Sequence, residues 1–357
     1  MKANTCALAL AILLSIVSGF SQDDYLIRTQ WGQKAPYNAF CPSIQGQKAP
    51  LSSAAVALGQ LVHFHQHPRN WAGKVRYFSR QIHEVDFSQE IWRYTEIESE
   101  PAALARLLFH LDVGMRTNFF PNVSLTEWVQ MLDFVRNNLQ YQVEELQSNT
   151  GFQELEFEIR SALSANTPVL FQAYDSLSRA YHYGLIDGGR NIAGRLEYHI
   201  NWGWGGYADG WYDPGKPGYP FSRYRFKPRL ALLTPKAPAV TNISASLDEK
   251  DQIRLSWDAP LRDNRLLYQI YRQKRGAPSS LRLMSGWNSR IFFLDMEVEP
   301  GTYYEYFVFA AFNGSEATNS LAATATGKAF SEVCPSFFRI ADQTEDLTLL
   351  DWDLRDA

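Results

Sequence analysis

Residues 51–65, LSSAAVALGQLVHFH, determine the fold of the first half of this 357-residue chain. Their side chains are apolar around most of the helical circumference until the histidines, which predicts a buried helix rather than a surface one. Pro50 supplies a rigid φ, and Ser52 and Ser53 supply capping hydroxyls, where a helix begins. The segment therefore predicts a central helix that starts at the serines and ends at Pro68.

Two further segments carry residue types that a catalytic site needs. Residues 182–188, HYGLIDG, predict a strand that begins with a histidine, and residues 198–206, YHINWGWGG, place an asparagine before a turn rich in tryptophan and glycine. A helix N-terminus favours a negative charge, and an imidazole within hydrogen-bonding distance can act as a general base. If the chain brings these segments to the start of the predicted helix, they form such a site.

These segments resemble the streptopain family of papain-like cysteine peptidases. That family opens its central helix with GCVATA and continues to a glutamine, a Tyr-His pair and a proline. Gln60, His65 and Pro68 fall in register with this pattern, and the register places Ser53 at the catalytic cysteine. The histidine strand and the WGWGG segment match as well. Smaller matches extend the resemblance over residues 25–230, at 31–33, 36–38 and 166–169.

The resemblance implies an α+β papain-like peptidase fold, in which a central helix packs on an antiparallel sheet with a cleft between them. It also implies a role for each matching residue. His182 is the base, and Asn201 or the ring of Trp202 orients it. Gln33 and the backbone N–H of Ser53 form the oxyanion hole. The family's nucleophile is a thiolate, because a helix end and an imidazolium can lower a thiol pKa from ~8.5 to ~3–4.

Three departures from the family pattern predict that peptidase activity is absent. Serine at position 53 is far too weak an acid to rest as an alkoxide beside an imidazolium. Ala180 and Tyr181 stand where the family has two glycines, which let a substrate backbone approach closely. Trp31 follows the predicted export cleavage point by about ten residues, too few for the family's inhibitory prosegment. We therefore expect an inactive homologue that binds a peptide or protein ligand in its cleft.

Two other functions are open on the same residues. Ser53 and His182 could form an active hydrolase. Alternatively, the chain could act as an adhesive or structural protein through its second domain. Single residues also have purely structural explanations, because serines before an apolar helix are commonly caps and an isolated histidine is usually structural.

Other histidines and the cysteines are weaker candidates. His63 and His67 have the i, i+4 spacing of zinc ligands, but no glutamate of a zincin pattern lies between them, so we expect neither a metal nor a cofactor. Cys41 has no helix start or base beside it and is not expected to be a nucleophile. With the export signal removed, Cys41 and Cys334 remain, either as a disulfide or as two separate buried thiols.

The N-terminal residues 1–21 resemble an export signal. Lys2 precedes an apolar run at residues 7–17, and small residues fit the positions before a cleavage site. The mature chain is then expected to begin near Gln22, in a secreted or periplasmic protein. The run is too short to span a bilayer comfortably and no other long one follows, so we expect no membrane anchor. The net charge of −4 gives no basic footprint, and nucleic acid is not an expected partner.

A segment with two prolines, residues 234–238, separates a streptopain-like domain at 22–234 from a second domain at 235–328. In the second domain, apolar and polar residues alternate in several short runs, which predicts the strands of an all-β sandwich. Trp257 on an early strand and Tyr304 before a later one resemble the fibronectin type III pattern.

The C-terminal segment, residues 329–357, carries seven acidic residues and two arginines. Such a tail is most often a solvated segment. Its residues 347–354 alternate enough to form an added strand.

Overall fold

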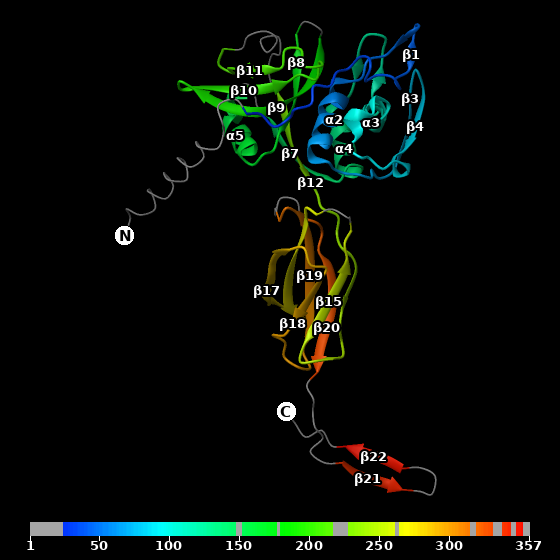
Figure 1. The fold of residues 1–357 in the computed structure, drawn as a ribbon, viewed down its shortest axis with the longest axis vertical. Helices are drawn as coiled ribbons and strands as arrows, with labels where there is room; N and C mark the ends of the chain where they lie inside the picture. Colours follow the sequence, from blue (N-terminus) through cyan, green and yellow to red (C-terminus); the bar gives the residue numbers. More distant parts are fainter. Residues whose placement is uncertain are drawn as a thin grey trace. The chain divides into compact units, whose positions relative to one another are not determined.

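Figure 1 shows the fold of the chain as a computed structural model. The predicted export signal, Cys334 and most acidic residues of the C-terminal segment lie outside the described residues. No helix in the described part of the chain is long and apolar enough to cross a membrane. The chain divides into two compact units between Pro235 and Lys236, one residue after the predicted boundary. The structure describes residues 24–147, 152–176, 179–216, 228–260, 264–314, 319–330, 338–343 and 348–352.

The first unit combines helices with an antiparallel sheet. In Figure 1 its helices α2 to α4 lie to one side and the strands of the large sheet to the other. The helices are α2 (Ser53–His65), α3 (Pro101–Gly114), α4 (Trp128–Asn137), α5 (Glu156–Ser164) and the short η1 (Phe87–Gln89), η2 (Ile97–Ser99) and η3 (Phe152–Leu155). Small two-stranded sheets join β1 (Ser43–Ile44) to β2 (Gln47–Lys48), β3 (Lys74–Ser79) to β4 (Gln81–Asp86), and β5 (Asn118–Phe119) to β6 (Ser124–Leu125).

The large sheet has the strand order β11-β10-β9-β8-β12-β7, and every neighbouring pair is antiparallel. Its strands are β7 (Tyr141–Gln147), β8 (Val169–Asp175), β9 (Ala180–Ile192), β10 (Arg195–Asn201), β11 (Gly210–Tyr212) and β12 (Arg229–Pro235). The helix α2 packs against β9 and against α3. This arrangement confirms the predicted fold, a central helix on an antiparallel sheet.

The central helix forms where the sequence predicts it. Ser52 is the N-cap, and its Oγ accepts a hydrogen bond from the backbone N–H of Ala55. Every residue from 53 to 62 is buried, as expected for a helix without a polar face. The helix ends at His65, earlier than Pro68, because Gln66 adopts a left-handed conformation and its N–H closes the last turn.

A glycine allows α3 to approach α2. A Cβ built on Gly59 would lie 2.4 Å from Cδ2 of Leu108, a side chain of α3 that is itself fully buried. Glycine inside a helix is less favourable than alanine by about 1 kcal/mol, so close packing must outweigh propensity here. The contact sets the distance between the two helices.

The second unit is a fibronectin type III-like sandwich of two sheets, with the strand orders β13-β15-β18 and β14-β20-β19-β16-β17. The backbone N–H of Glu299 donates to the hydroxyl of Tyr304 at 3.0 Å, which is the tyrosine contact typical of such sandwiches. Trp257 lies in the core, as predicted. The strands are β13 (Thr241–Ala245), β14 (Glu249–Lys250), β15 (Ile253–Asp258), β16 (Leu266–Lys274), β17 (Ala277–Asn288), β18 (Phe292–Asp295), β19 (Tyr303–Phe312) and β20 (Ala323–Phe330).

The structure differs from the sequence expectation at the segment between the units. Thr234 and Pro235 are not outside the sheet but form the end of β12, opposite Gln142 and Tyr141. A proline is tolerated there because it is the last residue of the strand. In the C-terminal segment, β22 (Thr348–Trp352) lies within the stretch predicted as a strand and pairs with β21 (Phe338–Gln343).

Replacing Gly59 by alanine tests the packing of α2 on α3. We expect Gly59→Ala to lower the free energy of unfolding by about 1–2 kcal/mol, because overpacking of a buried contact exceeds the gain in helix propensity. Urea unfolding of the full chain measures this. Gly210→Ala is the matched control, because a Cβ at Gly210 meets nothing within 4 Å, and its change should stay below about 0.5 kcal/mol. Equal losses in the two variants would contradict the packing argument.

Candidate functional site

Ser53 is the first residue of α2, and its hydroxyl lies against the sheet. The backbone N–H of Tyr183 donates to Ser53 Oγ at 3.1 Å, and the side chain is only 6% exposed. Tyr183 follows His182 in β9. The structure therefore brings the predicted nucleophile position and the predicted base to neighbouring places, 129 positions apart in the chain.

The imidazole of His182 is held by a backbone carbonyl. Its Nε2 lies 2.9 Å from the carbonyl oxygen of Trp202, and the side chain is 8% exposed. Because a carbonyl only accepts, Nε2 carries the hydrogen, and the lone pair of the neutral ring is on Nδ1. The backbone N–H of Trp202 donates in turn to Asp209, whose pKa is raised to about 6 by burial. The Trp202 backbone is thus fixed through both its N–H and its carbonyl.

The ring of Trp202 also lies next to His182. The ring is fully buried, with Phe171 at an edge and Trp204 stacked on it. The centroid of the His182 ring lies 5.9 Å from that of Trp202 and 4.9 Å from that of Trp204. Trp204 is only partly buried, so it is the tryptophan that both contacts the histidine and reaches the surface.

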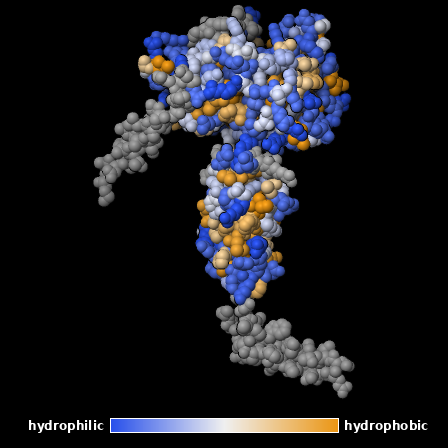
Figure 2. Space-filling model, viewed as in Figure 1, coloured by the Kyte–Doolittle hydropathy of each residue, from blue (hydrophilic) through white to orange (hydrophobic). Residues whose placement is uncertain are grey.

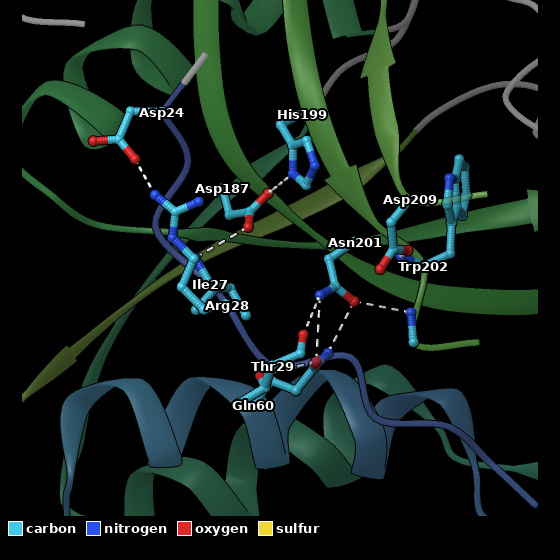
Figure 3. Close-up of polar contacts among 11 residues, drawn as sticks. Asp24, Ile27, Arg28, Thr29, Gln60, Asp187, His199, Asn201, Trp202 and Asp209 are labelled. Carbon is cyan, nitrogen blue, oxygen red and sulfur yellow. Dashed lines mark hydrogen bonds and ion pairs between the residues drawn. The ribbon is translucent and has the colours of Figure 1, made fainter. Parts of the chain in front are cut away.

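The amide of Asn201 does not orient His182 but joins the helix, the sheet and the N-terminal segment (Figure 3). Asn201 and Gln60 form a reciprocal amide pair, with N···O distances of 2.9 and 3.3 Å. Asn201 Nδ2 also donates to the carbonyl of Thr29, and Oδ1 accepts from the N–H of Gly203. These four bonds use the full capacity of an asparagine side chain. Asn201 is therefore a structural residue here.

Gln33 lies beside the loop that leads into α2. Its Nε2 donates to the carbonyl of Leu51 at 2.8 Å, and the backbone carbonyl of Gln33 accepts from the backbone N–H of Leu51. One of the two hydrogens on Nε2 of Gln33 is thus bonded to Leu51, two residues before Ser53. The other hydrogen is the one that could donate to an oxyanion.

Asp112 is a buried carboxyl behind the helix start, which the sequence analysis missed. It accepts from both the N–H and the Oγ of Ser52, the latter at 2.5 Å, and from the hydroxyl of Thr117 at 2.7 Å. Burial raises its pKa to about 7, although the bonds from Ser52 and Thr117 act in the opposite direction. The available signal was a lone acid in the apolar helical run LLFHLDV at residues 107–113.

An acid–histidine pair holds the N-terminal segment to the sheet, and it too was missed (Figure 3). Asp187 Oδ1 lies 2.6 Å from Nδ1 of His199, while Oδ2 accepts from the N–H of Ile27. The ring of Tyr25 stacks on His199 with centroids 3.9 Å apart. The pair therefore fixes residues 25–27, from which the chain continues to Gln33.

Aromatic side chains surround the surface next to His182. Tyr181 is 56% exposed and packs against Tyr174. Tyr207 is also exposed and lies near the ring of Trp204. The position before the histidine, where the family pattern has glycine, thus carries an exposed ring.

The three histidines in and just after the central helix contact three different partners. His63 lies against the carbonyl of Tyr94, His65 against the hydroxyl of Tyr141, and His67 against the carbonyl of Gln140. Within the described ranges no three histidine, cysteine or acidic side chains are grouped to hold a metal ion. Cys41 is fully buried, and burial raises the pKa of its thiol far above the ordinary value, which disfavours a nucleophilic role.

Comparison with known proteins identifies the first unit. The model of the peptidase C10 family matches residues 31–212, which is half of the chain. The chain belongs to the peptidase C10 family. It is 24% identical over 213 residues to streptopain of Streptococcus pyogenes serotype M1, covering 51% of this chain and 52% of streptopain. It is also 24% identical over 204 residues to the thiol protease/hemagglutinin PrtT of Porphyromonas gingivalis, covering 50% of this chain and 22% of PrtT.

The chain spans about half the length of the streptopains that it matches. Among solved structures, the active wild-type interpain A cysteine protease of Prevotella intermedia aligns with 59% of this chain and 98% of its own, with a TM-score of 0.50 and 21% identity. This likeness supports the fold alone. A fibronectin type III-like protein of Clostridium thermocellum is 31% identical over 26% of this chain and 95% of its own, with a TM-score of 0.22. The sandwich assignment rests on the strand order and Tyr304.

The buried carboxyl of Asp112 predicts a pH dependence of stability. Its pKa is about 7 in the folded chain and about 3.9 in an unfolded one, so the folded state binds the proton more tightly. The stabilisation is complete below pH 4 and is lost as the pH rises through 7. Between pH 4 and pH 7, the free energy of unfolding of wild type should fall by on the order of a few kcal/mol relative to that of Asp112→Asn.

Urea unfolding at pH 4, 5.5 and 7 measures this difference. Asp187 and Asp209 are present in both wild type and Asp112→Asn, so the effect of their titration on stability cancels when the two proteins are compared. Asp133→Asn, at an exposed position of α4, is the control and should follow wild type. Parallel curves for wild type and Asp112→Asn would contradict the raised pKa.

Proposed function

We propose that this chain is an exported C10 homologue that lacks peptidase activity and binds a peptide or protein ligand at the aromatic surface beside Ser53 and His182. The observation that carries the proposal is the serine at the family's cysteine position, with its Oγ accepting the N–H of Tyr183. The architecture of the family is present, and its nucleophile is not. The signal-like residues 1–21 support export, which N-terminal sequencing of the secreted protein tests by its expected start at Gln22.

The local electrostatics favour a thiolate and not a serine nucleophile. A helix end and an imidazolium can ionise a thiol near neutral pH, but an alcohol needs a strong base at the moment of attack. Serine hydrolases support that base with a carboxylate, and loss of the carboxylate lowers kcat by about 10⁴-fold in a serine protease. Nε2 of His182 faces the neutral carbonyl of Trp202 instead. At Nε2 the base beside Ser53 is thus held by a neutral oxygen and not by a carboxylate.

The surface next to the site supports binding. Where glycine would let a substrate backbone come close, Tyr181 places an exposed ring against Tyr174. Tyr181, Trp204 and Tyr207 offer aromatic area with polar edges, the side-chain type that dominates protein interfaces. Tyr181, whose ring would obstruct a cleavable backbone, can together with Trp204 and Tyr207 hold the side chains of a ligand.

An active serine hydrolase is the second candidate. One observation favours it: the Nε2–H tautomer of His182 leaves the basic lone pair on Nδ1, as a general base requires. The two candidates differ in whether Ser53 reacts.

Restoring the cysteine tests the proposal. We expect Ser53→Cys to be alkylated by iodoacetamide at pH 6, where an ordinary thiol reacts slowly, and the additional change His182→Ala to abolish this. We expect no cleavage of casein by Ser53→Cys, because a misplacement of about 1 Å can cost ~10²-fold in rate. Adding Ala180→Gly and Tyr181→Gly should bring back measurable cleavage. Iodoacetamide labelling of wild type measures the background that comes from Cys41 and Cys334.

Binding is measured separately with denatured casein as the probe. Trp204→Ala should weaken binding at least tenfold, while Phe78→Ala, at an exposed position of β3, should not. Cleavage by wild type that is lost in Ser53→Ala, or labelling of Ser53 by a fluorophosphonate, would establish the hydrolase. Full peptidase activity of Ser53→Cys alone would show that Tyr181 obstructs nothing.

A further inference from the structure

The second unit has a hollow on the outer face of its larger sheet. Figure 2 shows that hydrophobic side chains gather on the visible face of this unit. The hollow has a volume of about 340 Å³, within the range of small-molecule sites. It lies over β16, β17 and β19, and its lining residues are Gln269, Tyr271, Gln273, Leu281, Phe307, Phe309 and Asn319.

Aromatic rings and carboxamides alternate across this face. Alternate residues of a strand share a face, so Gln269, Tyr271 and Gln273 of β16 point the same way. In the register of β16 with β19, Tyr271 lies opposite Phe307 and Gln269 lies opposite Phe309. The rings of Tyr271 and Phe309 meet edge to face, with centroids 5.8 Å apart. The hollow therefore has apolar walls with an amide beside each ring.

The polar groups of the hollow are all uncharged. They are the carboxamides of Gln269, Gln273 and Asn319 and the phenol of Tyr271. Asn319 Oδ1 is buried and has no hydrogen-bond partner among the described residues. Because an unpaired buried acceptor is unfavourable, a ligand that donates a hydrogen bond there would be stabilised.

We propose that this hollow binds a neutral carbohydrate. A pyranose has an apolar C–H face that can stack on an aromatic ring, and a rim of hydroxyls that can both donate to and accept from carboxamides. The volume suits one or two such rings. An anionic ligand would find no counter-charge in the lining, because the nearest charged group is the carboxylate of Glu305, which accepts from Gln273. A purely apolar ligand would leave Asn319 Oδ1 unpaired. This site is independent of the function proposed for Ser53 and His182.

Calorimetric titration of the full chain tests the site. The probes are maltohexaose, cellohexaose, xylohexaose and the hexamer of N-acetylglucosamine, with a hyaluronan oligosaccharide as the charged comparison. We expect saturable binding of at least one neutral probe and none of the hyaluronan. Tyr271→Ala and Asn319→Ala should each weaken that binding at least tenfold. Phe292→Ala, an exposed ring on β18 of the other sheet, is the control and should bind as wild type does.

The melting temperature of each variant is measured alongside. If Tyr271→Ala unfolds the unit, binding is instead measured with Asn319→Ala and Tyr271→Phe. Tyr271→Phe is chosen because it keeps the aromatic ring. Absence of saturable binding by every neutral probe overturns the proposal, and so does binding that survives both Tyr271→Ala and Asn319→Ala. A dimer in sedimentation that Tyr271→Ala dissociates would also overturn it, because the occupant would then be a second copy of the chain.

Discussion

The reciprocal amide pair between Gln60 and Asn201 is the constraint on which the first unit depends. It joins the middle of α2 to the end of β10, and both side chains are buried. Gln60 also accepts from Thr29 and Trp31 of the N-terminal segment. If any one of these elements moved away, several polar groups would lie in a dry interior without partners, at about 1–3 kcal/mol each. The helix, sheet and N-terminal segment therefore hold their positions together.

This constraint explains why the geometry around position 53 does not depend on which side chain stands there. Ser53 is placed by the capped start of α2, His182 by β9 and the carbonyl of Trp202, and Gln33 by the segment that the amide pair holds. None of these positions depends on the sulfur of a cysteine. The same scaffold is thus compatible with either cysteine or serine at position 53.

Much of the fold could be predicted from local sequence, and much of the site could not. The buried helix and its cap follow from an apolar run after two serines, and Tyr304 follows from its place before an aromatic strand. In contrast, Asp112 bonds to Ser52 across 60 positions, and Asp187 pairs with His199 across the β9–β10 hairpin. One sequence does not show which buried polar groups meet. Asn201 illustrates the limit, because its motif indicated catalysis and its contacts are structural.

The place of β12 in the large sheet has a consequence for synthesis. This strand is the last of the first unit, yet it lies between β7 and β8. Until residues 229–235 have left the ribosome or passed a translocation pore, β7 has no neighbour in the sheet and the polar backbone edge of β8 is uncovered. Domains generally fold as units during synthesis, beginning at the N-terminus. Here the first unit can complete its sheet only when its own last residues have emerged, by which time synthesis of the second unit has already begun.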